Sequence, residues 1–302
     1  VTQPYVPVNS MRLEVAGTAG LAVGDRVFIR RPATERWIQA LGTDDFGGDR
    51  HGPRWHTESH EIAWDRTITA IDGRTIAIDA PLTTAIAAEF GGPTVQKYNW
   101  PGRIERVGVE NLRLISEYDA DNPKDEDHSW FAITCQDVEN AWVRRVTAVH
   151  FAGGAVALWE RTSRVTVEDC RSLAPISEVG GFRRTAFQTL GQLNLFQRCV
   201  SQQGRHDFAA GFMAAGPNAF VQCEAIESLH LSGGISSWAS GVLYDNVRID
   251  GNVLGFGNLS SNYNGAGWSA ANSVLWQCSA SVIRCYSPPT AQNWAFGCWG
   301  QF

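Results

Sequence analysis

The segment VTVEDCRS (165–172) resembles three others in the chain, LFQRCVS (195–201), AFVQCEA (219–225) and VLWQCSA (274–280). Each alternates apolar and polar residues, reaches a cysteine and continues through one variable residue to Ser or Ala. Two related segments, AWVRRVTA (141–148) and VLYDNVRI (242–249), lack the cysteine. If the cysteine position is taken as an anchor, the anchors fall at 146, 170, 199, 223, 246 and 278, at intervals of 24, 29, 24, 23 and 32 residues.

Irregular repeats of this length, built of short strands and Gly/Asn turns, indicate a solenoid. The Leu/Asn consensus of leucine-rich repeats is absent, and no periodicity of about 3.6 residues supports helical repeats. The pattern therefore predicts an all-β fold, a right-handed parallel β-helix. In it Cys170, Cys199 and Cys223 point inward and stack about 4.8 Å apart as packing groups.

The composition fits this prediction and excludes some partners. Hydrophobic residues make up 44% of the 302 residues, enough for a sizeable core, and 30 glycines with only 19% charged residues favour a β-rich chain. The net charge of −6 argues against a nucleic-acid binder. No apolar run approaches the roughly 20 residues of a membrane span, so we expect no membrane partner.

The first hundred residues differ from the repeats. RTITAIDGRTIAIDAPL (66–82) predicts a hairpin that turns at Asp72-Gly73. We read residues 1–100 as a β-rich N-terminal part with a long polar loop at about 42–62, and residues 101–302 as the β-helix. The loop suits a lid over a cleft, and a surface loop is an equal alternative.

A second strand precedes each anchor, and a basic residue stands where that strand begins. These residues lie 15 to 20 positions before the anchors, and they are His128, His150, Arg183 or Arg184, His206 and His230. On stacked coils they would form a column about 4.8 Å apart. A single histidine at such a position is usually a turn residue, but stacked cations cost repulsion unless an anion lies against them. The column therefore predicts a cleft for an anionic substrate.

Within this column the stretch Arg205-His206-Asp207 is the leading catalytic candidate. His206 would be a general acid or base, held by Asp207 or by a neighbour on the adjacent coil. Arg184 and Arg205 would face an acidic group of the substrate. Two tryptophans near the predicted cleft, Trp55 and Trp238, are candidates for sugar stacking.

Metal binding is not favoured at the column, because arginine occupies its middle rung and no tight zinc-ligand motif is present. The run DADNPKDED (119–127) holds five carboxylates. It is typical of a solvated loop, although calcium is an alternative because hard cations bind clustered oxygens. We therefore expect no cofactor unless calcium binds there.

The phrases DNVRIDGN (245–252) and NSVLWQCSA (272–280), together with the cysteine ladder, resemble the pectate-lyase-like superfamily of right-handed parallel β-helices. The resemblance covers roughly residues 101–302. It implies a carbohydrate-active protein, since the superfamily contains polysaccharide lyases, glycoside hydrolases, a few epimerases and phage tailspikes. The GHG and RIK motifs of polygalacturonases are absent, so no catalytic residue is transferred.

Three functions follow for a polysaccharide partner. The first is a lyase that cleaves a uronate-containing polysaccharide by β-elimination, with Arg183, Arg184 and Arg205 neutralising the uronate and His206 or His150 as base. His128 and His230 would bind substrate. The second is a glycoside hydrolase that uses Glu178 and Asp207. The third is a non-catalytic adhesin or tailspike-like module.

The compartment and assembly are also expectations. Enzymes that cut polymers meet them outside the cytoplasm, so we expect a secreted or periplasmic protein. The sequence from Val1 shows no signal peptide, and we expect the leader to lie outside it. Both a monomer and a homo-oligomer are compatible with the sequence.

Overall fold

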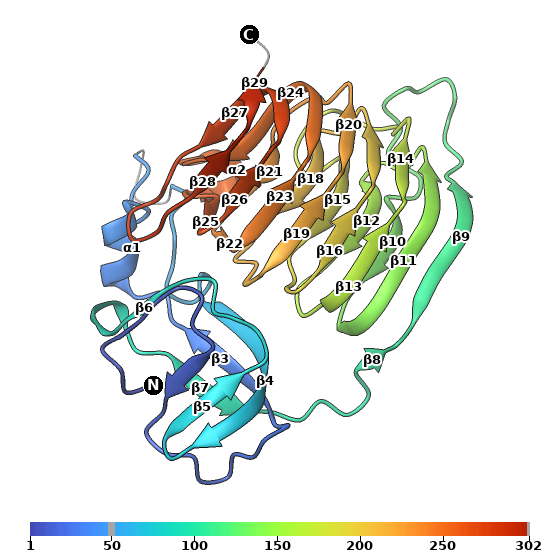
Figure 1. Cartoon of the computed structure of the whole chain (residues 1–302). Helices are drawn as coiled ribbons and strands as arrows, with labels where there is room; N and C mark the ends of the chain where they lie inside the picture. Colours follow the sequence, from blue (N-terminus) through green and yellow to red (C-terminus); the bar gives the residue numbers. More distant parts are fainter. Residues whose placement is uncertain (48–51, 301–302) are drawn as a thin grey trace.

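The computed structural model describes residues 1–47 and 52–300. Its main body is one large sheet of parallel strands wound into a right-handed parallel β-helix, which confirms the predicted fold (Figure 1). Its strands are β8 (Ile104–Glu105), β9 (Gly108–Ile115), β10 (Phe131–Cys135), β11 (Val138–Val149), β12 (Gly154–Leu158), β13 (Ser163–Glu168), β14 (Arg171–Leu173), β15 (Thr185–Thr189), β16 (Leu195–Gln197), β17 (Val200–Gln202), β18 (His206–Ala210), β19 (Asn218–Val221), β20 (Glu224–Ile226), β21 (Ser232–Gly234), β23 (Val242–Asp245), β24 (Arg248–Phe256), β26 (Val274–Trp276), β27 (Ser279–Cys285), β28 (Trp294–Phe296) and β29 (Trp299–Gly300).

Three rows of strands run along the β-helix. One row pairs β10, β12, β15, β18 and β21 in turn. A second passes through β11, β13, β16, β19, β23, β26 and β28, and a third through β9, β11, β14, β17, β20, β24, β27 and β29. The turns that join the rows include those that carry Arg205 and His230.

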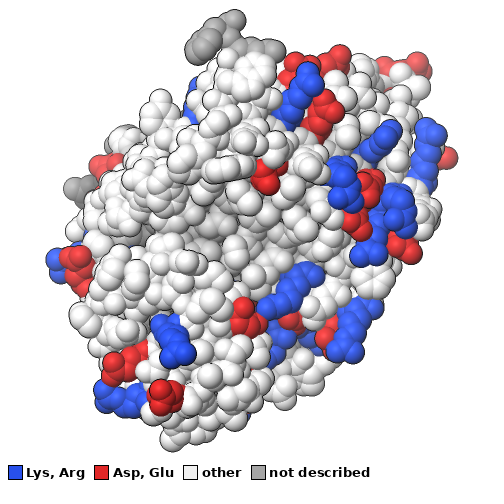
Figure 2. All heavy atoms as spheres, viewed as in Figure 1, with Lys and Arg blue, Asp and Glu red and all other residues white. Residues whose placement is uncertain are grey.

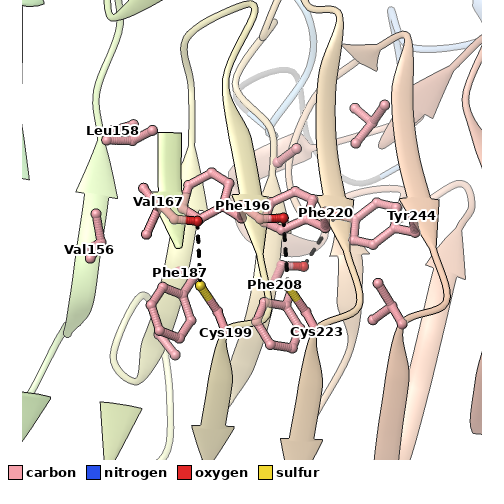
Figure 3. Close-up of a cluster of buried hydrophobic side chains, with 14 of the residues drawn as sticks. Val156, Leu158, Val167, Phe187, Phe196, Cys199, Phe208, Phe220, Cys223 and Tyr244 are labelled. Atoms are coloured by element: carbon pink, nitrogen blue, oxygen red, sulfur yellow. Dashed lines mark hydrogen bonds between the residues drawn. The ribbon is translucent and has the colours of Figure 1, made fainter. Parts of the chain in front are cut away.

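The predicted cysteine ladder is confirmed. Cys170, Cys199 and Cys223 are almost completely buried, and the Cys199 thiol donates to the carbonyl oxygen of Val167 on the preceding coil at 3.7 Å (Figure 3). The expected anchor at Asn246 is wrong by one residue. Strand pairing places Val247 in the ladder, and because strand side chains alternate between faces, Asn246 lies outside the core.

An aromatic ladder fills the core beside the thiols. The ring centroids of Phe196 and Phe220 are 4.7 Å apart, and those of Phe220 and Tyr244 are 4.8 Å apart, with nearly parallel planes (Figure 3). These distances match the spacing of adjacent strands, so each coil contributes one ring to a continuous stack. The core is therefore built from contacts between neighbouring coils.

Charged side chains on the outer face of the first coils neutralise one another. Arg144 and Arg198 both pair with Glu168, at 2.7 and 3.2 Å. Figure 2 shows blue and red atoms side by side at this end of the molecule, whereas the centre of the same face is largely uncharged. The outer row of charges is therefore a solvated surface of paired ions.

The N-terminal part is an antiparallel sheet of order β2-β5-β4-β3-β7, with the predicted hairpin between β4 and β5. The elements outside the β-helix sheet are β1 (Tyr5–Val6), β2 (Arg12–Glu14), β3 (Arg26–Arg31), α1 (Glu35–Leu41), β4 (Ile62–Asp72), β5 (Thr75–Ile78), β6 (Ile86–Ala87), the 3-10 helix η1 (Ala88–Phe90), β7 (Thr94–Lys97), β22 (Ala239–Ser240), α2 (Asn262–Gly265) and β25 (Ala270–Ala271). No helix in the described residues is long and apolar enough to cross a membrane. Residues 48–51 of the predicted loop lie outside the described residues.

Buried hydrogen bonds fix the N-terminal sheet to the β-helix. The indole of Trp64 donates to the carbonyl oxygen of Ala215 at 3.0 Å. The guanidinium of Arg66, 1% exposed, donates to the side chain of Gln192 at 2.7 Å and to the carbonyl oxygen of Gly216 at 3.0 Å. Because these polar groups would be unsatisfied if the sheet moved away, the hydrogen bonds hold the N-terminal sheet in place against the β-helix.

Candidate functional site

Two adjoining cavities lie over the coils of the β-helix. The larger, of about 690 Å³, is lined by the N-terminal sheet and by the coils; we call it the large cavity. The second, of about 590 Å³, lies over the turns that precede successive strands; we call it the arginine cavity. Phe182, Tyr263 and Asn264 line both, so the two cavities form one groove.

The arginine cavity is assembled from consecutive coils. Arg205 precedes β18 and His230 precedes β21, so the stacking of these strands places the two side chains on neighbouring turns. Asn252 of β24 and Arg284 of β27 extend the row. Tyr263 of α2 closes the cavity from a loop that folds back over these turns.

A tyrosine–histidine pair stands in this cavity. The hydroxyl oxygen of Tyr263 lies 3.3 Å from Nδ1 of His230, and the His230 ring is exposed. Tyr263 and Asn264 adopt left-handed backbone angles, with φ of 53° and 61°. Many non-glycine residues at the turns of this fold share such angles, so here the conformation shapes the loop that carries Tyr263 over the cavity.

The cavity is electropositive. Arg205 and Arg284 line it, and no carboxylate among the described residues does. The guanidinium of Arg205 lies 5.5 Å from the ring centroid of Tyr263. Partial burial lowers the pKa of His230, and the charges of Arg205 and Arg284 lower it further. His230 is therefore a neutral base at neutral pH, next to two cations that have no acidic partner in the cavity.

His206 does not take the predicted catalytic role. It is fully buried, its Nδ1 lies 2.6 Å from the carbonyl oxygen of Leu231, and its Nε2 lies 2.6 Å from Nη1 of Arg205. Nδ1 must donate to the carbonyl, so Nε2 accepts from the guanidinium. Burial lowers the pKa of His206 to about 3, and the charge of Arg205 adds to this effect. His206 is thus a neutral support for Arg205.

Asp207 does not hold His206. Its fully buried carboxylate accepts hydrogen bonds from the hydroxyls of Ser201, Ser228 and Ser232 at 2.6, 2.5 and 3.3 Å. Adjacent side chains of a strand point to opposite faces, which separates Asp207 from the ring of His206. Burial raises the pKa of Asp207 to about 6.

The other residues of the predicted central rung are paired elsewhere. Glu178 is exposed and forms an ion pair with Lys124 at 3.0 Å. Arg183 donates to Glu126 at 2.7 Å, and Arg184 donates to the carbonyl oxygen of Ser177 at 2.7 Å. None of the three lines either cavity, and Glu178 and Asp207 do not form the carboxylate pair expected of a hydrolase.

The predicted single column holds only for His206 and His230, which share one register and have ring centroids 5.6 Å apart. In the earlier coils, strand pairing aligns His206 with Thr185, Gly154 and Phe131. His128 and His150 lie three and four residues before this register, and both pack against Tyr118 instead, with ring centroids 6.2 and 4.8 Å away. The turns differ in length from coil to coil, so counting back from the anchors does not preserve the register.

Trp55 and Trp238 are also corrected, because they are 2% and 0% exposed and cannot form a sugar platform. The indole of Trp55 donates to the carbonyl oxygen of Gly265 at 3.1 Å, and that of Trp238 donates to Thr84 at 3.2 Å. The two rings pack where the N-terminal part meets the coils. Trp55 thereby supports the end of α2, next to Tyr263.

The large cavity contains two exposed phenyl rings and both signs of charge. The rings of Phe182 and Phe212 have centroids 5.5 Å apart. The charged lining residues are Arg30, Glu61, Glu160 and Arg161, and Glu61 forms an ion pair with Arg30.

Tyr263 is a site residue that the sequence analysis did not predict. It lies in SSNYNGAGW (260–268), whose Gly and Asn content indicates a loop but not its position in the fold.

The described residues contain no group of three or more His, Cys, Asp or Glu placed to hold a metal ion. In the acidic run, Asp125 accepts hydrogen bonds from the backbone N–H groups of Asp119 and Asp127 at 2.9 and 3.0 Å. The Asp125 carboxylate therefore stabilises its own loop.

No protein-family model matches the sequence, and no curated protein sequence matches it. Matching solved structures include the tailspike protein gp49 from Pseudomonas phage LKA1, 13% identical over 97% of this chain and 40% of that chain, with a TM-score of 0.32. They include the gp54 tailspike of Acinetobacter baumannii bacteriophage AP22 in complex with A. baumannii capsular saccharide (10% identity, 94% and 57% coverage, TM-score 0.40). The Pseudomonas phage phi297 tailspike gp61 also matches, with 10% identity over 94% of this chain and 58% of that chain and a TM-score of 0.37. This chain spans about half the length of these tailspike chains.

Proposed function

We propose that this protein is a lyase that cleaves an acidic, uronate-containing polysaccharide by β-elimination in the arginine cavity. The observation that carries the proposal is the hydrogen bond between Tyr263 and His230 in an open cavity whose charged lining residues are arginines. Elimination needs a group that neutralises the uronate carboxylate, a base and an acid. The cavity holds a candidate for each role.

Arg205 and Arg284 bind the uronate carboxylate. Their charge withdraws electron density from C5 of the sugar and stabilises the developing carbanion, whose negative charge spreads onto the carboxylate. Arg205 is held in place for this task by His206, which accepts one of its N–H bonds. Asn252 lies in the same row and offers neutral hydrogen bonds to the sugar.

His230 and Tyr263 move the protons. In the tautomer with a proton on Nδ1, His230 donates to the Tyr263 oxygen, and its Nε2 lone pair takes the proton from C5. The C5–H electrons form the C4–C5 double bond, the C4–O bond breaks, and the Tyr263 hydroxyl protonates the leaving oxygen. The Nδ1 proton then passes to the tyrosinate along the 3.3 Å contact, which leaves a neutral Tyr263 and the Nε2–H tautomer of His230. Exchange of the ring protons with water returns the Nδ1–H tautomer before the next turnover.

One alternative has a specific observation behind it. Glu61 and Glu160 line the large cavity, which adjoins the arginine cavity, and a glycoside hydrolase needs two carboxyl groups flanking the bond to be cut. A non-catalytic carbohydrate-binding module would use the same groove without producing fragments. Since polymers of this kind are met outside the cytoplasm, we also propose a secreted or periplasmic location.

The test is a digestion of acidic and neutral polysaccharides, with the products examined for the ultraviolet absorbance of an unsaturated uronate end. Wild-type protein is expected to produce it from at least one acidic polymer, and Tyr263→Phe to produce it far more slowly. Fragments without this absorbance, produced by wild type and lost in Glu160→Gln, would establish the hydrolase instead. If the protein binds a polysaccharide but produces no fragments from it, the non-catalytic binding module would be supported instead.

A further inference from the structure

The pair of exposed rings in the large cavity is not used by the elimination chemistry. Phe182 and Phe212 are 41% and 37% exposed, although their rings contact each other at 5.5 Å. Exposed apolar surface gathered in a groove marks a binding site. Phe182 also lines the arginine cavity, so this ring platform begins where the proposed uronate subsite ends.

The two cavities differ in charge. The arginine cavity presents Arg205 and Arg284 with no described acidic residue to balance them. In the large cavity two arginines are balanced by two glutamates, Glu61 and Glu160, and Glu61 is paired with Arg30. A carboxylate placed in the large cavity would gain no net attraction and would lie near two like charges.

We infer that the substrate is a heteropolymer in which each uronate is followed by an uncharged sugar, and that this uncharged sugar stacks on Phe182 and Phe212 in the large cavity. This inference rests on the proposed function for the position of the uronate. The apolar C–H face of a sugar ring suits a phenyl platform, and its hydroxyls or amide reach the polar groups around the rings, among them Gln192 and Ser237.

The test is equilibrium binding to the Tyr263→Phe protein, which keeps the polymer intact. The probes are two alternating polymers, hyaluronan and unsulfated chondroitin, and two homopolymers, polygalacturonate and polymannuronate, in which every residue carries a carboxylate. An alternating polymer is expected to bind roughly tenfold more tightly than either homopolymer. Adding Phe212→Ala should remove this preference, whereas adding Tyr286→Ala, at an exposed ring outside the groove, should keep it.

Equal or tighter binding of the homopolymers, or a preference that survives Phe212→Ala, would overturn the inference. Different outcomes test the proposed lyase function and the alternating substrate. A homopolymer cleaved by wild type to unsaturated ends would support the lyase and contradict the alternating substrate. An alternating polymer bound with the expected preference, but hydrolysed or released intact, would support the platform and contradict the lyase.

Discussion

The hydroxyl oxygen of Tyr263 lies 3.3 Å from Nδ1 of His230, although the two residues are 33 positions apart in the chain. The β-helix supplies His230 from a turn between coils, and the loop after β24 brings Tyr263 back over that turn. The scaffold therefore places a base on a turn of the stacked coils and an acid on a loop above it. Four predictions follow from this arrangement and from the core beneath it.

Tyr263→Phe removes the acid while keeping the ring. Because one acid or base group contributes roughly a hundredfold to ten-thousandfold, we expect turnover to fall by that factor while polymer binding stays close to that of wild type. The measurements are kcat from the rate of unsaturated product and Kd from equilibrium binding. Tyr286→Phe, at a ring that is 62% exposed, is the matched control and should change neither. Full turnover in Tyr263→Phe would exclude Tyr263 as the acid.

The pKa of His230, measured by NMR titration of its imidazole, should lie below the ordinary 6.5. Burial and two nearby arginines disfavour the charged ring, so removing a cation by Arg284→Gln should raise this pKa. Arg248→Gln, at an arginine paired with Glu224 outside the cavity, should leave it unchanged. The low-pH limb of kcat/KM should fall as the pH drops through the His230 pKa, because only the neutral ring accepts the proton. If the pKa of His230 is the same in Arg284→Gln as in wild type, the charge of Arg284 does not act on His230, which would contradict its place in the site.

Asp207→Asn should remove a pH dependence of stability. The folded-state pKa of Asp207 is about 6, above its usual 3.8, so its contribution is fully present below about pH 3.8 and is lost as the pH rises through about 6. The shift corresponds to about 3 kcal/mol. Relative to Asp207→Asn, wild type should therefore lose about that much free energy of unfolding between pH 4 and pH 7, measured by denaturant titration. Asp245→Asn, on the outer face of β23, is the control. Parallel curves for wild type and Asp207→Asn would contradict the buried position of this carboxyl.

Phe220→Ala should interrupt the aromatic ladder. The ring is fully buried between Phe196 and Tyr244, and truncation of a buried phenylalanine costs roughly 3–5 kcal/mol. Phe296→Ala, at a ring that is 47% exposed on the last coil, should cost less than about 1 kcal/mol. Equal losses in the two variants, measured by chemical unfolding, would contradict a core built from stacked coils.

The fold could be predicted from the sequence because one signal repeats. Cys170, Cys199 and Cys223 share an alternating context, and the same buried position selects a small apolar residue in each coil. The method failed at Asn246, where a slip of one residue exchanges the inner and outer faces. Repetition therefore identifies the core but fixes each strand only to within a residue.

The candidate site could be predicted only in part. Arg205 and His230 were selected because their turns precede strands of one row, and both line the arginine cavity. The same reasoning predicted a catalytic role for His206, which is fully buried and bonded to Arg205 and to the carbonyl oxygen of Leu231. Tyr263 could not be placed, because a loop without periodicity carries no information about the coil against which it folds.

The most direct test of the central claim is digestion of an acidic polysaccharide in water enriched in heavy oxygen, followed by mass spectrometry of the fragments. Elimination breaks the C4–O bond without consuming water, so the account predicts that one of the two fragments from each cut ends in a C4–C5 double bond and carries no heavy oxygen at that end. Two saturated fragments, whose summed mass exceeds that of the parent chain by one molecule of water, would contradict it, because water would then have entered the bond that the His230–Tyr263 pair is proposed to break by proton transfer alone.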